Sequence, residues 1–267
     1  MGYIVGGGVE HALGWRSAFF VAGVPGMALA LLCLLVAEPT RRPAPKSALF
    51  AAARALAGVP VYRLATLGYC AHTAAIGAFA FWAPKYLVTR YGMPLGRASA
   101  TFGLVTVVCG FVGTIVGGWL ADAAVRARSI PSASPSIADD RATARANLTV
   151  CVLSAALGAP LAAAAILAPT PTVFFVLLVP CEIALFVSNS PVNVAMLRSA
   201  PPGLRASAMA LGIFAIHLLG DLWSPPLVGL VADHAPWTLA MMAAPIGFGI
   251  AALVWQGGAN APSDRLT

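Results

Sequence analysis

The chain has 267 residues, of which 60% are hydrophobic and only 9% are charged, and its formal net charge is +7. A typical soluble domain has about 25% charged residues, so this supply is too small to cover a water-soluble surface. The composition excludes an ordinary soluble enzyme and predicts an all-α polytopic membrane protein, organised in apolar spans of about 20 residues.

The chain begins with an apolar, glycine-rich stretch at residues 1–9. It has the composition of a helix interior, but it supplies only about half of the length that a span requires. No basic residue precedes it, so we do not expect a cleaved signal peptide. We expect a partial helix here, and two explanations stay open: the preceding helices are missing, or the chain is a natural fragment that needs a partner.

Three uncharged runs follow, at residues 17–37, 64–84 and 98–121. None of them contains Asp, Glu, Lys or Arg, and each is long enough to cross a hydrocarbon core about 30 Å thick. The basic, proline-containing stretch 38–63 reads as a solvated connector that has room for a surface helix. We therefore predict three membrane-spanning helices in the first half of the chain.

Four further spans are predicted in the second half. The apolar stretch from residue 146 to 181 is too long for one helix, but Pro169-Thr170-Pro171 interrupts it, because proline breaks helical hydrogen bonding. This gives spans near 146–168 and 172–197, with two more near 206–231 and 237–256. The total is seven full transmembrane helices and one partial helix.

The distribution of Lys and Arg predicts the orientation of the spans. One side holds Arg41, Arg42, Lys46, Arg54, Arg63, Arg126, Arg128, Arg141, Arg145, Arg198, Arg205 and Arg265, and the other only Arg16, Lys85, Arg90 and Arg97. By the positive-inside rule the richer side is cytoplasmic, so we expect a multi-pass protein of the inner membrane with a cytoplasmic C-terminus. Since topology explains the net charge, nucleic acid is not an expected partner.

Neither a metal, a cofactor nor an enzymatic motif is expected. The five cysteines lack the paired spacing of a zinc or redox site, so we interpret them as small core residues. The four histidines lie on separate helices without the spacing of a catalytic motif.

The first candidate site is a polar stripe in the span near 172–197. Ionisable groups inside spans cost about 2.5 to 3.5 kcal/mol on insertion scales and usually face a bundle interior or a wet cavity. Glu182 is followed by Phe186, Asn189 and Asn193 at +4, +7 and +11, which places them within about 40° of one helical face. Two readings are open: substrate or proton handling, and a protonated carboxyl bonded between helices.

The second candidate is the pair of His217 and Asp221, which are four residues apart and therefore adjacent on one helical face. An imidazole beside a carboxylate can share a proton in a low-dielectric cavity, which suggests a proton relay; a purely structural bond is the alternative. Ser224, Pro225 and Pro226 follow, and they predict a bend that suits gating.

The span at 64–84 supplies a third group. His72 and Phe79 share a face, and Trp82 lies to its side, so all three are candidates to line a cavity. The alternatives are a core position for His72 and an interfacial aromatic belt for Trp82. Small-residue spacing also predicts close helix packing at Gly110, Gly113 and Gly117.

The residues resemble a known family. The segments GYIVGGG (2–8), LGWRSAFF (13–20) and GVPG (23–26) are similar to the fifth and sixth helices of the major facilitator superfamily. Four later segments resemble the Spinster-like members of this superfamily: AFWAP (80–84), PVNVA (191–195), IHLLGD (216–221) and SPPLVG (224–229).

The resemblance implies a partial major facilitator fold, in which two bundles of six helices work by alternating access. Residues 1–37 would be the end of the N-terminal bundle, 38–63 the cytoplasmic linker, 64–256 the C-terminal six-helix bundle and 257–267 a cytoplasmic tail. It also implies transport of a small organic or lysolipid-like solute. The residues themselves, Glu182, His217 and Asp221, are the candidate groups for binding this solute or for coupling its transport to protons. A non-transporting fragment or a membrane assembly partner is the alternative function.

One motif implies a gate. Residues 118–122, Gly-Trp-Leu-Ala-Asp, are similar to the superfamily's cytoplasmic loop motif, in which the acidic residue latches the inner gate. The resemblance carries over to Asp122 and to the nearby Arg126, although the pattern breaks at Ala123. The expected partners of Asp122 are Arg205 and the N-terminus of the next-to-last helix, where partial positive charge favours a carboxylate.

Overall fold

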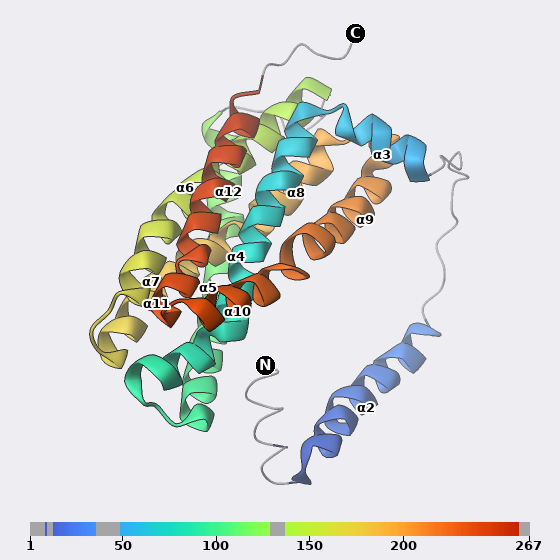
Figure 1. The fold of residues 1–267 in the computed structure, drawn as a ribbon. Helices are drawn as coiled ribbons and strands as arrows, with labels where there is room; N and C mark the ends of the chain where they lie inside the picture. The colour runs from blue at the N-terminus through green and yellow to red at the C-terminus, as the bar shows by residue number, and fades with distance from the viewer. Residues whose placement is uncertain (1–8, 10–12, 36–48, 129–136, 262–267) are drawn as a thin grey trace.

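The structure is a computed structural model that describes residues 9, 13–35, 49–128 and 137–261. Within these ranges the secondary structure is helical (Figure 1). Seven helices are long and apolar enough to cross a membrane, which confirms the predicted number of spans. They are Arg16–Cys33, Pro60–Tyr91, Leu95–Ala127, Ala138–Ile166, Pro171–Ser199, Pro202–His234 and Trp237–Ala259. The predicted partial helix at 1–9 lies almost wholly outside the described residues.

Except for the first, Arg16–Cys33, which is shorter than the run at 17–37, the spans built on uncharged runs are longer than those runs. Helix α4 (Pro60–Tyr91) starts with a proline in its first turn and ends at Gly92, whose left-handed backbone (φ 67°) closes the helix. Helix α5 (Leu95–Ala127) likewise includes Arg97 and Arg126. Charged side chains near helix ends can extend along the helix toward the interface, so a charge does not end a span.

The predicted break near residue 169 is present. Helix α6 (Ile137–Ile166) ends before it, and α7 (Pro171–Val187) begins after it, where the Thr170 hydroxyl accepts a hydrogen bond from the Val173 N–H at 3.3 Å. A turn at Ser188 then separates α7 from α8 (Asn189–Ser199), and the two helices form one span.

The next span is also segmented. It runs through η1 (Pro202–Leu204), α9 (Arg205–Ala215), the π-helical segment η2 (Ile216–Asp221) and α10 (Ser224–His234). In η2 the Leu222 N–H donates to the His217 carbonyl at 3.0 Å, which is the five-residue spacing of a π-turn. Regular α-helix therefore stops at Ala215 and resumes at Ser224, so the irregular part lies just before the bend that the sequence predicts at Ser224, Pro225 and Pro226. Helices α11 (Trp237–Met241) and α12 (Ala243–Ala259) form the last span.

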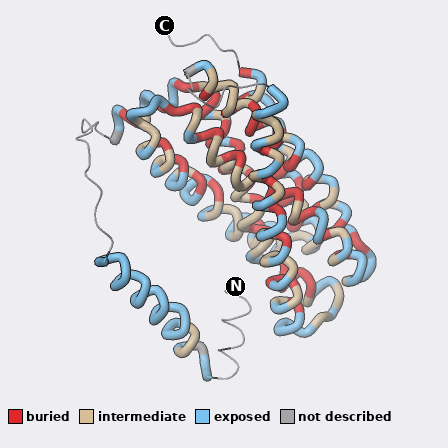
Figure 2. The backbone as a smooth tube through the Cα atoms, turned by 180° about the vertical axis from the view of Figure 1, so that it is seen from behind, coloured by how far each residue is buried: buried red, intermediate tan, exposed pale blue. Residues whose placement is uncertain are grey.

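The spans from α4 to α12 pack around a common interior (Figure 2). Small residues let the helices approach closely: a Cβ on Gly68 of α4 would lie 2.5 Å from the indole of Trp255 on α12. The same indole donates to the Ala65 carbonyl at 3.1 Å. The small residue Gly68 thus makes room for the large Trp255 side chain, which holds α12 against α4.

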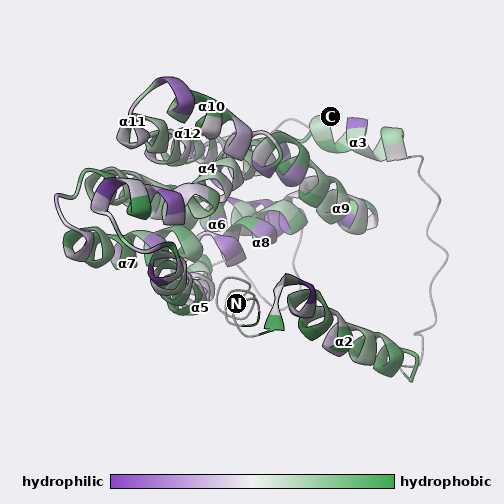
Figure 3. Ribbon diagram, turned by 60° about the horizontal axis from the view of Figure 1, so that its bottom comes forward, coloured by the Kyte–Doolittle hydropathy of each residue, from purple (hydrophilic) through white to green (hydrophobic). Residues whose placement is uncertain are grey.

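Two helices near the start of the chain are different. Helix α2 (Trp15–Cys33) stands apart from the other spans (Figure 1), and its described side chains are exposed or half-exposed, including Phe19, Phe20 and Met27. In Figure 3 the ribbon of α2 has mostly the colour of hydrophobic residues. The short helix α3 (Leu49–Ala57) fits the expected surface helix, because it buries Ala52 and Leu56 at the end of the bundle and leaves Phe50 exposed.

Candidate functional site

Glu182 is buried between α5 and α7, with 5% of its surface exposed. Its Oε1 accepts a hydrogen bond from the Thr106 hydroxyl at 2.8 Å. Its Oε2 has no hydrogen-bond partner, and no ion pair reaches the carboxyl group in the described part of the chain. A buried carboxyl with one free oxygen has room to bind a proton, so the geometry fits both readings of this residue.

The predicted polar stripe is divided by the turn at Ser188. Phe186 on α7 packs its ring against Gly110 of α5, and Asn189 and Asn193 lie half-buried on α8. The Asn193 amide donates to the Asn189 carbonyl at 2.7 Å, and Asn193 also interacts with the Tyr69 hydroxyl on α4. The stripe therefore joins α5, α7, α8 and α4 instead of following one straight helix.

The hydrogen bond to Glu182 gives a stability prediction. Thr106→Val should lower the free energy of unfolding by about 1 to 3 kcal/mol, because it leaves a second carboxyl oxygen unsatisfied at a buried position. Thr106→Ser keeps the hydroxyl and is the matched control. Chemical unfolding in detergent micelles measures both variants, and equal stability of Thr106→Val and the parent protein would show that this bond contributes nothing.

The pair of His217 and Asp221 is formed as the spacing predicts. The His217 Nδ1 lies 2.9 Å from Asp221 Oδ2, and the side chains are 65% and 38% exposed. The pair sits in the π-helical segment η2, in the middle of a span. Gly77 of α4 leaves room for it, since a Cβ there would lie 3.1 Å from Asp221 Oδ1. Single π-turns inside α-helices are frequent at functional sites.

His72 occupies the core of the bundle. It has no exposed surface, and its ring centroid lies 5.4 Å from that of Phe248 and 5.3 Å from that of Trp255. Its Nε2 lies 3.1 Å from the Ser188 hydroxyl. The cavity-facing interpretation of His72 is therefore wrong for this structure, and the core alternative describes it.

Phe79 and Trp82 also connect helices. Phe79 is buried and meets Phe102 of α5 edge to face at 5.9 Å. The Trp82 Nε1–H donates to the Pro225 carbonyl at 2.8 Å, and its ring lies 5.1 Å from that of Trp237. These contacts give both side chains structural positions in the bundle.

The bond from Trp82 should have a measurable contribution. Trp82→Phe removes the donor and leaves the Pro225 carbonyl without it, so we expect a loss of about 1 kcal/mol in unfolding free energy. The neighbouring Phe81 is 58% exposed, and Phe81→Leu should change stability little. Thermal unfolding in detergent compares the two variants, and the reverse order of stability would contradict this assignment.

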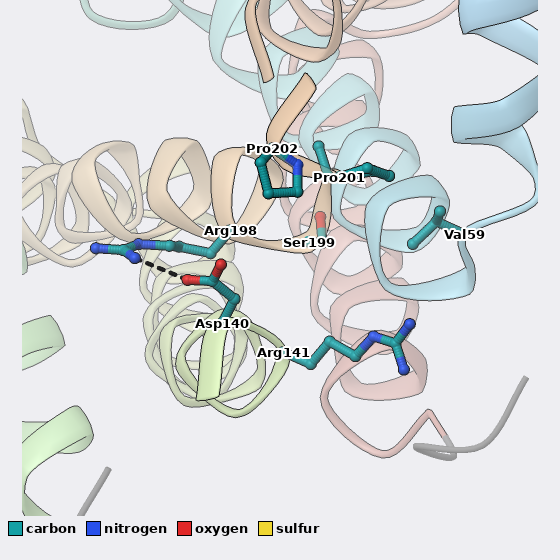
Figure 4. Close-up of a pocket in the computed structure, with 8 residues that line it drawn as sticks. Val59, Asp140, Arg141, Arg198, Ser199, Pro201 and Pro202 are labelled. Atoms are coloured by element: carbon teal, nitrogen blue, oxygen red, sulfur yellow. Dashed lines mark hydrogen bonds and ion pairs between the residues drawn. The ribbon is translucent and has the colours of Figure 1, made fainter. Parts of the chain in front are cut away.

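The expected gate partners are different from those in the structure. Asp122 and Arg126 are exposed, whereas the carboxylate that Arg205 meets is Asp140 at the start of α6 (Figure 4 shows Asp140). Asp140 also accepts from Arg198 at 2.7 Å. The expected pairing of Asp122 with Arg205 is therefore wrong, because Asp140 lies where α8 ends and α9 begins.

The glycines of α5 form a packing face, as predicted. A Cβ on Gly113 would lie 2.7 Å from the Ile183 carbonyl oxygen, and a Cβ on Gly117 would collide with the Val187 carbonyl. Only glycine at these positions lets the backbones of α5 and α7 meet. This contact sets the position of Glu182, which lies one residue before Ile183.

Comparison with known proteins identifies the family of the chain. The sequence profile of the Major Facilitator Superfamily matches residues 1–225. The chain belongs to this superfamily. Its resemblance to Spinster-like members is confirmed as well: it is 30% identical to "Probable sphingolipid transporter spinster homolog 2" of Arabidopsis thaliana, over 96% of the chain and 53% of that protein.

Other relatives give the same result. "Protein spinster homolog 1" of Homo sapiens is 31% identical over 88% of the chain and 46% of that protein. The chain thus spans about half the length of the curated relatives it matches. The names of the Arabidopsis relatives describe transporters, in agreement with the prediction that this superfamily member is not an enzyme.

Solved structures show the same fold. A bacterial homologue of the human lysosomal transporter Spinster, in an inward-facing and unoccupied conformation, matches with a TM-score of 0.67 at 17% identity, over 92% of the chain and 59% of that structure. The Escherichia coli fucose:proton symporter FucP (N162A) matches with a TM-score of 0.64 at 16% identity, over 92% of the chain and 55% of that structure. Both likenesses support the major facilitator fold.

The sequence did not single out Asp140 or the π-helical form of η2 in this superfamily member. A signal for Asp140 exists: Asp139 and Asp140 open a helix, where acidic residues are favoured by the helix dipole, and the basic Arg198 and Arg205 flank the next connection on the same side. The π-turn has no comparable signal, because its hydrogen bonds depend on neighbouring helices.

Proposed function

We propose that the chain forms the C-terminal bundle of a secondary transporter that moves a solute across the membrane by alternating access. The observation that carries this proposal is the exposed pair of His217 and Asp221, in a π-helical segment in the middle of a span. An ionisable pair in such a place is costly in hydrocarbon and is stable where it faces a wet pathway. Membership of the superfamily supports the same conclusion.

The proposed cargo is a small organic or amphipathic, lysolipid-like solute. The names of the Arabidopsis relatives, which describe probable sphingolipid transporters, support this class. Large exposed apolar side chains around the pair, among them Phe214, Leu218 and Trp223, would suit the apolar part of such a solute. Because the chain spans about half of its relatives, a second bundle would supply the other wall of the pathway.

Proton coupling is part of the proposal. Asp221 and Glu182 are carboxyl groups at mid-membrane positions, and His217 can exchange a proton with Asp221 across 2.9 Å. The structural neighbour FucP is described as a fucose:proton symporter, which supports protons as the coupling ion. Asn189 and Asn193 would add hydrogen-bonding groups on the Glu182 side, whereas His72, Phe79 and Trp82 would act through packing.

The orientation follows the charge distribution. The Lys- and Arg-rich ends of the spans, where Asp140 meets Arg198 and Arg205, are proposed to face the cytoplasm, with the C-terminus on the same side of the inner membrane. Asp122 and Arg126 lie at the same end as exposed residues of α5 and remain candidates for contacts with a second bundle during gating.

The test is solute uptake into proteoliposomes that contain the chain with any bundle that co-purifies with it. Accumulation of a labelled lysolipid above the level of protein-free vesicles, and its dependence on an imposed proton gradient, are the expected results. Lysolipid uptake equal to that of empty vesicles, with the protein folded and inserted, would favour the alternative of a non-transporting assembly partner.

A further inference from the structure

The carboxyl group of Asp221 keeps part of its binding capacity free. Its Oδ2 lies 2.9 Å from the His217 Nδ1, and its Oδ1 has no hydrogen-bond partner within the described ranges. A neutral imidazole can donate from Nδ1, and in that state the pair retains the full negative charge of the carboxylate. Asp221 is also partly exposed in the middle of its span. A ligand can therefore reach both an oxygen atom and a negative charge here.

The basic residues of the described spans lie near the span ends. Among them Arg145 is the farthest from an end, seven residues after Ala138, where its span begins. Asp221, by contrast, lies nineteen residues after Pro202 and thirteen before His234, the two ends of its own span. Opposite charges attract strongly at low dielectric, and like charges repel. The middle of the described bundle therefore favours a cationic group over an anionic one.

Helix α4 supplies the neighbours of Asp221. A Cβ on Gly77 would lie 3.1 Å from Asp221 Oδ1, so this glycine marks the level of the carboxyl group on α4. The nearest basic residue of α4 is Lys85, eight residues further and thus about 12 Å along the helix axis. Tyr69 is close enough for a charge interaction with Asp221 and also interacts with Asn193 of α8. The neighbours add hydrogen-bonding oxygens and no basic side chain at this level.

The same side of the segmented span has large apolar side chains. Phe214 lies three residues before His217, and Leu218 lies three residues before Asp221, which places each beside one member of the pair. Phe214 and Leu218 are both exposed. A ligand bound at Asp221 would therefore meet an apolar surface next to the carboxylate.

We propose that the surface at His217 and Asp221 selects its solute by charge. It binds the ammonium group of a single-chain amphiphilic amine through the Asp221 carboxylate, and it rejects amphiphiles whose only charge is negative. This inference rests on the proposed function, because it takes the pair as part of the solute site, and it narrows the class of solute. Phe214 and Leu218 contact the apolar chain, while the ammonium N–H groups donate to Asp221.

The test is equilibrium dialysis of the purified full chain in neutral detergent against radiolabelled octylammonium, with protein-free micelles as the background. Unlabelled octylammonium, octanol and octanoate compete; they share one chain length and differ in head-group charge. We expect saturable binding that octylammonium displaces at least about tenfold more effectively than octanoate or octanol does, as for one charge-assisted hydrogen bond.

Three variants locate the site. Asp221→Asn should bind octylammonium at least about tenfold more weakly, and Asp221→Glu should restore the preference for the cation, because it restores the charge. Asp233→Asn removes an exposed carboxylate from the same span, near the end of α10, and should bind as the parent protein does. Size-exclusion chromatography confirms that each variant is folded before dialysis.

Each outcome decides the proposal. Preference for octylammonium that Asp221→Asn loses and Asp233→Asn keeps supports it. Absence of saturable binding to the folded parent protein, equal competition by octanoate, or an equal loss in Asp221→Asn and Asp233→Asn would overturn it. The experiment involves no transport, so a failed uptake assay and a failed charge preference remain separate results.

Discussion

Asp221→Asn should abolish solute-driven proton movement. The amide retains the size of the carboxyl group and can still accept a hydrogen bond from His217, which lies 2.9 Å away, but it cannot bind and release a proton. We therefore expect the protein to insert and fold while proton flux falls to the level of empty vesicles. A pH-sensitive dye trapped in proteoliposomes that contain the chain with its co-purifying bundle, exposed to a lysolipid gradient, measures this flux.

Asp233→Asn is the charge-matched control for that experiment. Asp233 is an exposed residue near the end of α10, in the same span, and lies outside the polar segment η2. The control should retain the proton flux of the parent protein. Undiminished flux in Asp221→Asn would remove this residue from the coupling mechanism and leave Glu182, tested in the same way by Glu182→Gln, as the remaining carboxyl group.

Gly117→Val should be the most destabilising substitution among the packing glycines of α5. A Cβ at this position would collide with the backbone of Val187, which cannot rotate away as a flexible side chain would. Overpacking that forces two helix backbones apart costs about 3 kcal/mol or more. We expect loss of folded protein in detergent, measured as the monodisperse fraction by size-exclusion chromatography and as the unfolding temperature.

The adjacent Gly118 provides a control in the same helix turn. A Cβ on Gly118 would have an ordinary contact, 3.9 Å from the Ser190 hydroxyl. Gly118→Val therefore adds the same β-branched side chain to the same helix without the backbone collision, and it should remain close to the parent in stability. If both valine variants fold equally well, α5 and α7 do not depend on the glycine face.

The spans could be predicted from the sequence because their signal is local. A run of about 20 uncharged residues has few alternatives in a membrane protein, and the Pro169–Pro171 break acts on the backbone directly. The contact between His217 and Asp221 could also be predicted from the sequence, because residues four apart are neighbours on an α-helix. The contact also forms in the wider π-turn of the structure.

The failures arose where a residue's environment depends on other helices. His72 lies on the same helix as half-buried neighbours. It is in the core because Phe248 and Trp255 of α12 pack against its ring. The partner of Arg205 depended in the same way on the position of the α6 N-terminus, which brought Asp140 closer than the motif residue Asp122. Helical periodicity alone contains no information on these distances.

The wide turn at η2 has a consequence for how its span can move. Helix α4 is hydrogen-bonded to this span at both ends of the turn. The Thr73 hydroxyl donates to the Ile216 carbonyl at 3.4 Å, and the Trp82 Nε1–H donates to the Pro225 carbonyl at 2.8 Å. Returning η2 to α-helical phase would twist one half of the span against the other by about 100° and slide it by about 1.5 Å. One of these two hydrogen bonds would then have to break. The two halves of the span can therefore change their relative helical phase only if one half loses its hydrogen bond to α4.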